Sequence, residues 1–220
     1  MIIFDNFLPN AEEVAAEFPV FDSDAWFEYN NPIEVKKTCN NWHHFGPETY
    51  KTFQYLLSKE FTEGLEDAFG VSLIPDLGLH GGGLHTHARG GKLNVHLDYD
   101  IHPKLDLQRY VNLIIYLTPG WKPEWGGGLG MWEDPETHTE TVFCKFNRAV
   151  LFETKGQWHG LPDPLKCPEG VTRNSIAVYY LTEPEGATDR KRALFVPSAD
   201  QAGNPDIQAL CEARSRMEGS

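Results

Sequence analysis

Six residues near the middle of the chain are the strongest guide to its fold: Leu93-Asn94-Val95-His96-Leu97-Asp98. Apolar and polar residues alternate in this stretch, which is the pattern of a β-strand with one buried face. Asn94, His96 and Asp98 share the polar face. An imidazole and a carboxylate two residues apart on one face can reach the same metal ion, although a polar surface strand would carry the same pattern. The stretch therefore predicts a strand and leaves two explanations for its polar face.

Short segments of the same kind continue on both sides of this strand. We expect further strands at Tyr110–Leu117, Thr141–Phe146, Ala149–Glu153 and Asn174–Leu181, with others near Leu73–Leu79 and Leu129–Trp132. Glycine, proline and aspartate separate these segments, and no helical pattern lies between them. Many short strands at this spacing are typical of an antiparallel sandwich or barrel. The sequence thus predicts a mainly β protein whose core spans residues 71–182.

Helical patterns flank the predicted core. A short helix is expected at Pro9–Phe18, and a longer one at Pro47–Phe69, where apolar residues recur every three or four positions. Gly70 follows the longer helix at the position of a C-terminal cap. Asn204 and Pro205 are typical of the start of a closing helix. The flanks are therefore expected to add helices to the β core.

Length and composition are consistent with one domain. The chain has 220 residues, of which 40% are hydrophobic, enough to build a substantial core. We expect a single domain over residues 1–220, with a helical N-terminal part at 1–70 and a C-terminal extension at 183–220. The formal net charge of −13 disfavours general binding to nucleic acid or to anionic membranes.

The same composition indicates a cytoplasmic protein. No stretch approaches the roughly 20 apolar residues that a membrane-spanning helix needs. An acidic residue, Asp5, interrupts the apolar start of the chain before a signal-peptide segment could form. The four cysteines are widely spaced and form no CxxC pair. This usage fits reduced thiols better than a disulfide framework.

Two residues elsewhere in the chain could join His96 and Asp98 in a functional site. His159 follows the predicted strand Ala149–Glu153 and supplies a possible third ligand. Arg173 opens the strand Asn174–Leu181 and shares a face with the small residues Ser175 and Ala177. A buried guanidinium is costly unless it meets an anion, so an inward-facing Arg173 predicts a carboxylate beside it. An exposed arginine at a strand end is the other explanation.

Two histidines and one carboxylate on one side of an ion leave three positions of an octahedron open. Non-haem Fe(II) oxygenases use this arrangement, whereas zinc more often takes four ligands or three plus water. The ordered set of HxD, a later histidine and a later arginine resembles the 2-oxoglutarate- and Fe(II)-dependent dioxygenases, specifically the prolyl-hydroxylase-like branch. The resemblance covers about residues 80–181. It includes RYVNLIIYL at 109–117, GGGL at 126–129 and TRNSIAVYY at 172–180.

This resemblance implies a double-stranded β-helix, or jelly-roll, core and a set of site residues. In it, His96, Asp98 and His159 would bind Fe(II). Arg173 would hold the distal carboxylate of the cosubstrate 2-oxoglutarate, with Tyr116 reaching the same group and Leu129 lining the cosubstrate pocket. O₂ would be the second cosubstrate, and ascorbate an optional addition.

The sequence departs from the family at one position. Many relatives carry a tyrosine nine or ten residues before the first ligand, where this chain has His87 and Thr86. His87 could donate a hydrogen bond to the cosubstrate in its place, or the pair His85 and His87 could line the substrate channel. Asn94 and Asn112 are further candidates for the site, since each shares a strand face with a residue named above.

The resemblance implies hydroxylation of an aliphatic C–H bond with release of succinate and CO₂. A peptidyl proline is the first candidate substrate, and an amino-acid-like molecule or another protein side chain competes with it. A cupin-like metal-binding barrel without oxygenase activity is the main alternative, but no glutamate follows His85 and His87 at the usual spacing. A zinc hydrolase built on the same triad would leave Arg173 and Tyr116 without a role.

Overall fold

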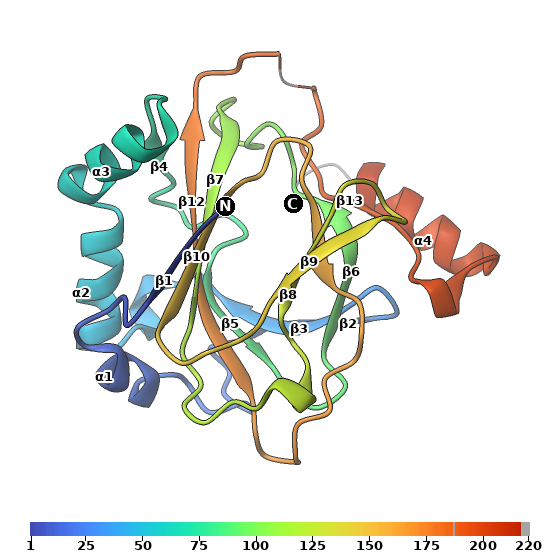
Figure 1. The fold of residues 1–220 in the computed structure, drawn as a ribbon, viewed down its shortest axis with the longest axis horizontal. Coiled ribbons are helices and arrows are strands. Elements are labelled where there is room, and N and C mark those ends of the chain that lie inside the picture. The colour runs from blue at the N-terminus through green and yellow to red at the C-terminus, as the bar shows by residue number, and fades with distance from the viewer. Residues whose placement is uncertain (187, 217–220) are drawn as a thin grey trace.

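The computed structural model describes residues 1–186 and 188–216. Its described strands form one antiparallel sheet that curls into two facing layers (Figure 1). The strands are β1 (Ile2–Asp5), β2 (Phe27–Asn31), β3 (Glu34–Cys39), β4 (Ile74–Pro75), β5 (Gly83–His87), β6 (Lys92–Leu97), β7 (Gln108–Tyr116), β8 (Leu129–Trp132), β9 (His138–Val142), β10 (Arg148–Glu153), β11 (Trp158–Leu161), β12 (Arg173–Thr182) and β13 (Leu194–Phe195).

The strand order confirms the predicted jelly-roll core. The path runs β1-β10-β7-β12-β5-β3-β6-β11-β8-β9, and every pairing along it is antiparallel. β3 pairs with both β5 and β6, so it joins the layer containing β7, β10 and β12 to the layer containing β6, β8 and β11. Strands from distant parts of the sequence therefore face one another across the interior.

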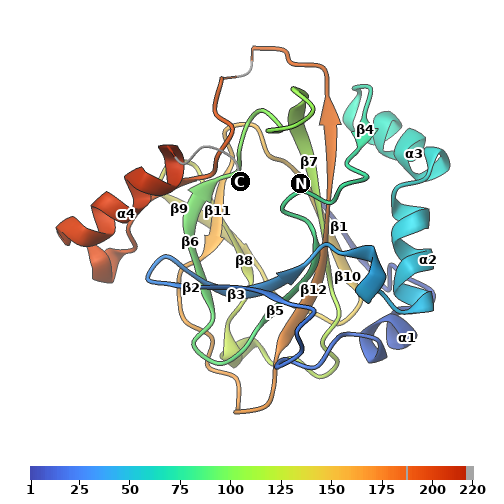
Figure 2. The same ribbon diagram turned by 180° about the vertical axis from the view of Figure 1, so that it is seen from behind.

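Three of the described helices cover the outside of one layer. The helices are α1 (Ala11–Ala16), α2 (Pro47–Leu56), α3 (Lys59–Phe69) and α4 (Pro205–Arg216), with short 3₁₀ turns at Trp42–His44, Pro123–Trp125 and Ala199–Gln201. In both views, α1, α2 and α3 lie beside β1, β7, β10 and β12, whereas α4 lies at the other side of the molecule, near β6 (Figures 1 and 2). No helix among the described residues is long and apolar enough to cross a membrane.

The main core lies between these three helices and the sheet. On β12, Ile176, Val178 and Tyr180 face the helices and are fully buried, and the Tyr180 hydroxyl donates to the Leu56 carbonyl oxygen at 2.6 Å. Burial of one such apolar side chain stabilises the fold by about 1.5–3 kcal/mol. The alternate residues of β12 point into the interior, as the two-residue period of the strand predicts.

The predicted helix at Pro47–Phe69 is two helices. α2 ends before Leu57, and the Ser58 side chain accepts a hydrogen bond from the Phe61 amide to cap α3. The apolar period continues through the break because both helices pack on the same face of the sheet, so periodicity alone could not reveal it. Gly70 caps α3 in the left-handed conformation, with φ of 71°, as predicted.

The N-terminal part is less helical than predicted. β1, β2 and β3 all come from residues 1–70 and pair with core strands or with one another. β1 carries consecutive apolar residues and lies at the open edge of β10, where Asp5 forms ion pairs with Lys145 and Arg148. The first 70 residues thus contribute to the sheet as well as to its helical cover.

Within the core, strand boundaries differ from the prediction at a few places. β8 matches its predicted range. β9 lies at His138–Val142 rather than Thr141–Phe146, and only Ile74–Pro75 of the predicted Leu73–Leu79 is a strand. β5 was not predicted, because all five of its residues are buried and the sequence GLHTH shows no apolar alternation.

The C-terminal extension packs against the barrel. β13 pairs with β6, and α4 follows it, beginning at Pro205 as predicted. The Asn204 side chain accepts hydrogen bonds from the amides of Asp206 and Ile207, which satisfies the start of the helix. The last four residues of the chain, within the predicted extension at 183–220, lie outside the described residues, as does residue 187.

Candidate active site

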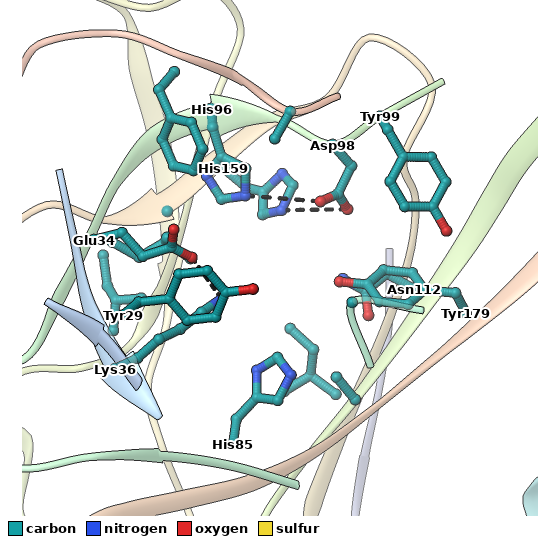
Figure 3. A pocket seen from close by; sticks show the side chains of 18 of the residues that line it. Tyr29, Glu34, Lys36, His85, His96, Asp98, Tyr99, Asn112, His159 and Tyr179 are labelled. Carbon is teal, nitrogen blue, oxygen red and sulfur yellow. Dashed lines mark ion pairs between the residues drawn. The ribbon is translucent and has the colours of Figure 1, made fainter. Parts of the chain in front are cut away.

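Three predicted ligands meet at the inner face of the β6 layer. His96 lies on β6, Asp98 directly follows it, and His159 lies opposite His96 on the neighbouring strand β11. One possible ligand atom from each side chain lies within 4.8 Å of the other two. The imidazole Nε2 atoms lie 3.8 Å and 3.7 Å from the Asp98 carboxylate, along the dashed lines in Figure 3. All three are buried, so the register of β6 and β11 builds a compact cluster.

The hydrogen bonds of both imidazoles leave Nε2 free for a ligand. Nδ1 of His96 lies 2.9 Å from the Asn94 carbonyl oxygen, and Nδ1 of His159 lies 3.0 Å from that of Gln157. A carbonyl oxygen can only accept, so each Nδ1 carries the proton and each Nε2 presents a lone pair. Burial, with His159 nearby, lowers the pKa of His96 to about 3, which keeps its ring neutral. Phe195 of β13 stacks on the His96 ring at 4.9 Å and fixes its plane.

Arg109 orients the carboxylate of the cluster. Its guanidinium lies 3.0 Å from Asp98 Oδ1 and is held 3.4 Å from the ring centres of both Tyr99 and Tyr179. Asp98 Oδ2 has no hydrogen-bond partner among the described residues. Burial raises the pKa of the Asp98 carboxyl, but Arg109 and the two histidines outweigh it and hold this pKa well below its usual range. Asp98 is therefore a charged carboxylate whose Oδ2, beside His159, has no hydrogen-bond partner among the described residues.

Arg109 was not predicted as a site residue, for a structural reason. Strand alternation from Asn112 places Arg109 on the helix-covered face of β7. The pairing of β7 with β12 shifts register, however: Val111 lies opposite Tyr180, whereas Arg109 lies opposite Leu181. The extra residue, Tyr110, is a β-bulge that reverses the alternation and turns Arg109 inward. A bulge leaves no signal that the sequence pattern could reveal.

Arg173 faces the interior and is buried, with no acidic partner among the described residues. Its Nε donates to the Gly127 carbonyl oxygen at 2.7 Å, and its guanidinium carbon lies 4.9 Å from the centre of the Tyr116 ring. Within residues 1–186 and 188–216, no carboxylate lies within ion-pair distance of it. Only 5% of Arg173 is exposed. The structure thus answers the question left by the sequence: the arginine faces inward, and the described chain supplies no anion for it.

A glycine turn makes room for this arginine. Gly127 has a φ of 78°, and a Cβ atom there would lie 2.9 Å from Arg173 Cδ and 2.7 Å from Leu165 Cδ2. A side chain at this position would therefore collide with the arginine and strain the backbone. The GGGL sequence accordingly shapes the wall against which the guanidinium lies.

The other predicted residues divide into two groups. Tyr116 lies beside Arg173, and His87 lies opposite Arg173 in the pairing of β5 with β12. The Tyr116 hydroxyl and both ring nitrogens of His87 lack hydrogen-bond partners in the described part of the chain. Leu129, Asn112, His85 and His87 line the same cavity as the cluster. Asn94 does not: its side-chain amide donates to the Val196 carbonyl oxygen and to Gln201.

The cavity has a volume of about 420 Å³ and includes residues from both ends of the chain. Tyr29, Glu34 and Lys36 come from the β2–β3 hairpin, and Arg214 comes from α4. Figure 3 shows Tyr29, Lys36 and His85 pointing toward the middle of the cavity, across from His96, Asp98 and His159. The sequence did not indicate the hairpin or α4 residues, because the site-bearing pattern is confined to the core.

Comparisons with known proteins agree with this geometry. Residues 82–181, just under half of the chain, match the family described as the 2OG-Fe(II) oxygenase superfamily. No curated protein matches the chain by sequence.

Solved structures resemble the fold at low sequence identity. A prolyl hydroxylase from Trichoplax adhaerens, in complex with a hypoxia inducible factor peptide fragment, is 18% identical over 82% of each chain, with a TM-score of 0.59. A Pseudomonas putida prolyl-4-hydroxylase is 20% identical over 83% of this chain and 92% of that one, with a TM-score of 0.57. HygX from Streptomyces hygroscopicus, bound to nickel, 2-oxoglutarate and hygromycin B, is 12% identical over 82% of each chain, with a TM-score of 0.55.

The family match covers the strands that carry the ligand cluster and Arg173, and the similar folds cover 82% and 83% of the chain. Residues 82–181 of the chain thus match the 2-oxoglutarate- and Fe(II)-dependent oxygenase superfamily, and the chain has the fold of the prolyl hydroxylases.

Proposed function

We propose that this protein is a dioxygenase that uses Fe(II), 2-oxoglutarate and O₂ to hydroxylate an aliphatic C–H bond, releasing succinate and CO₂. The observation that carries the proposal is the pairing of two incomplete sites in one cavity. One is a cluster with two free imidazole lone pairs and one unpartnered carboxylate oxygen. The other is a buried guanidinium without an acid among the described residues.

The residues present fit a divalent cation. His96 and His159 would supply neutral nitrogen ligands, and Asp98 would supply one negatively charged oxygen. Three ligands on one side leave room for cosubstrates, as in non-haem iron oxygenases. Arg109 holds the second carboxylate oxygen and so favours a one-oxygen contact by Asp98.

The residues around Arg173 fit the distal carboxylate of 2-oxoglutarate. A guanidinium binds a carboxylate through two parallel hydrogen bonds, which lysine cannot reproduce. The Tyr116 hydroxyl would add a further donor, because burial raises its pKa and keeps it protonated. His87 lies beside the arginine in the strand register, and we propose it as a third polar contact in place of the family tyrosine. Leu129 would pack against the cosubstrate chain.

Iron with 2-oxoglutarate and O₂ supplies the oxidising power that replaces a substrate C–H hydrogen by a hydroxyl group. The protein contributes position and shelter. Arg109 maintains the charge and direction of Asp98, the carbonyl oxygens of Asn94 and Gln157 fix the tautomers of the two imidazoles, and Phe195 excludes water from one side of His96.

The substrate class that we propose is a peptide or an amino-acid-like molecule, with a prolyl group as the first to test. Similarity in fold to prolyl hydroxylases supports this order of tests, although fold alone does not fix a substrate. A cytoplasmic location is part of the proposal: Cys39, Cys144, Cys167 and Cys211 are all free thiols, which suits a reducing compartment. A cupin-like barrel without oxygenase activity would not explain why Arg173 is buried with no acid beside it in the described part of the chain.

The test is conversion of 2-oxoglutarate to succinate by the purified protein with Fe(II), under air. We expect succinate formation that requires the metal and that a hydroxylatable compound stimulates. His96→Ala and His159→Ala should each abolish it. Absence of succinate under all these conditions, with intact 2-oxoglutarate binding, would leave a metal-binding barrel as the better account.

A further inference from the structure

The cavity concentrates positive charge although the protein as a whole is acidic. The chain has a formal net charge of −13. Among the described residues, its cavity lining includes six cationic side chains and two acidic ones. The cations are Lys36, Arg109, Arg173, Lys191, Arg192 and Arg214, and the acids are Glu34 and Asp98. Because the lining is positively charged in an acidic protein, it is suited to bind an anion.

Two of these cations contact the same carboxylate, that of Glu34, where the β2–β3 hairpin lines the cavity. Glu34 is 3% exposed. Its two oxygens contact Lys36 Nζ at 3.1 Å and an Arg214 nitrogen at 2.6 Å. One negative charge thus lies between two positive charges, and one positive charge is left over. The side chains of Lys36 and Arg214 are 12% and 29% exposed, so much of this excess charge is removed from water, which is costly unless an anion joins the group.

The excess persists when the proposed cofactors are counted. The charges of Asp98 and Arg109 cancel, as do those of a ferrous ion and the 2-oxoglutarate dianion. The remaining charged groups are Arg173 and the set Lys36, Glu34 and Arg214, which together stay positive. We leave out Lys191, because it contacts Asp106 at 2.6 Å, and Arg192.

Unpartnered polar atoms line the same cavity. His85 Nε2 and Asn112 Oδ1 are buried, and neither has a hydrogen-bond partner among the residues described. Burial, followed by the charges of Lys36 and Arg173, lowers the pKa of His85 to about 3, so its ring is neutral. In Figure 3 the Tyr29 hydroxyl points toward this space from the hairpin, between Lys36 and the ligand cluster. These groups would orient a polar molecule in front of the cluster.

We propose that the primary substrate is a small anionic molecule of the amino-acid type, whose carboxylate is bound by Lys36 and Arg214. The inference rests on the proposed function and narrows its substrate class. The ion pair of Glu34 with Arg214 joins β3 to α4 beside the cavity, so a peptide chain that passed between these two elements would have to separate them. A small molecule fits without that separation, and its carboxylate supplies the negative charge that the group lacks.

The test compares matched compounds on the same protein. The probes are L-proline and other free amino acids, each alongside its carboxamide, and a proline-containing peptide with an amidated C-terminus. Substrate-stimulated succinate formation gives KM and kcat, and calorimetry with Mn(II) and 2-oxoglutarate bound gives affinity without turnover. We expect an acid to stimulate turnover and to bind about tenfold or more tightly than its amide, the scale of one charged hydrogen bond.

Adjacent lysines on β3 provide a matched pair of variants. The side chains of Lys36 and Lys37 are both 12% exposed, but Lys37 lies 4.0 Å from the centre of the Phe21 ring and does not line the cavity. Lys36→Gln leaves Glu34 paired with Arg214, and Arg214→Gln leaves it paired with Lys36. We expect either variant to raise the KM for the acid about tenfold, with the KM for 2-oxoglutarate unchanged. Lys37→Gln should behave as the wild type.

Clear outcomes would overturn the inference. The inference is wrong if no acid is preferred over its amide. It is also wrong if the amidated peptide stimulates succinate formation as strongly as the acids do. Equal KM values for Lys36→Gln and Lys37→Gln would also overturn it, and a shift in melting temperature alone would mark Lys36 as structural. If the wild type binds and converts 2-oxoglutarate but shows none of this preference, the inference fails alone. If it forms no succinate, the proposed function fails.

Discussion

The cavity holds two buried arginines, and the main difference between their surroundings is the presence of a carboxylate. Arg109 has a carboxylate at 3.0 Å and a tyrosine ring on each side. Arg173 has one tyrosine ring, a carbonyl oxygen and the weak acceptors Cys144 and Ser175, but no carboxylate among the described residues. A buried charge that the protein has neutralised is part of the architecture. A buried charge that it has left uncompensated indicates a ligand.

Removing the compensated arginine should have the largest effect. Arg109→Ala would leave the Asp98 carboxylate buried without its cationic partner and would open a gap between Tyr99 and Tyr179. We expect a loss of about 3–5 kcal/mol in the free energy of unfolding of the metal-free protein, measured with urea. Arg89→Ala is the control, because 54% of its side chain is exposed, and it should cost little. A similar loss in both variants would show that Arg109 is not the special partner described.

Removing the uncompensated arginine should affect the ligand more than the fold. Arg173→Ala is expected to weaken 2-oxoglutarate binding by about 1.5–3 kcal/mol, since a hydrogen bond to a charged group is lost. Mn(II) binding should persist, because the ligand cluster is untouched. Arg173→Lys should recover only part of the affinity. The measurement is anaerobic titration of the metal-loaded variants, and unchanged affinity in Arg173→Ala would remove this arginine from the cosubstrate site.

Variants of two adjacent glycines can distinguish the effect of backbone strain from the effect of displacing Arg173. Gly126 and Gly127 have φ of 76° and 78°, but a Cβ at Gly126 would meet nothing within 4 Å. We expect Gly126→Ala and Gly127→Ala each to cost about 1–3 kcal/mol of stability through strain. Only Gly127→Ala should also weaken 2-oxoglutarate binding, because its methyl group would displace the arginine. Equal cosubstrate affinity in the two variants, by the same titration, would contradict the proposed role of the turn.

The smallest effect is expected at Tyr116. Tyr116→Phe removes a buried hydroxyl that has no hydrogen-bond partner in the described residues. Without cosubstrate, the free energy of unfolding should therefore stay equal or rise slightly. With cosubstrate, affinity should fall by about 0.5–1.5 kcal/mol. A fall in stability of the cosubstrate-free protein, measured by thermal unfolding, would mean that the hydroxyl already has a structural partner.

The contrast between the arginines also explains what sequence patterns could predict. Arg173 was recognised because β12 alternates regularly, with Ser175 and Ala177 on its face and Val178 on the other. Arg109 was missed because the bulge at Tyr110 reverses the alternation of β7. The same limit applies to β5, whose residues are buried on both faces and therefore carry no period.

The parts of the cavity outside the core were unpredictable for a different reason. Tyr29 and Lys36 reach the cavity only because β3 pairs with β5 and β6, which are distant in sequence. Arg214 reaches it because β13 pairs with β6 and brings α4 alongside. Local propensity contains no information about such pairings. The ligand order, in contrast, was visible because two of the three ligands lie two residues apart, His96 on β6 and Asp98 directly after it.

The position of the third ligand has a mechanical consequence. His96 and His159 are neighbours across two strands, yet most of the core sequence lies between them in the chain. A cation bound to both would act as a cross-link that closes this long loop, and closing a long loop restricts the unfolded chain. Loading the metal would then stiffen the layer formed by β6, β11 and β8 more than the helix-covered layer. Amide exchange in that layer would respond first to a chelator.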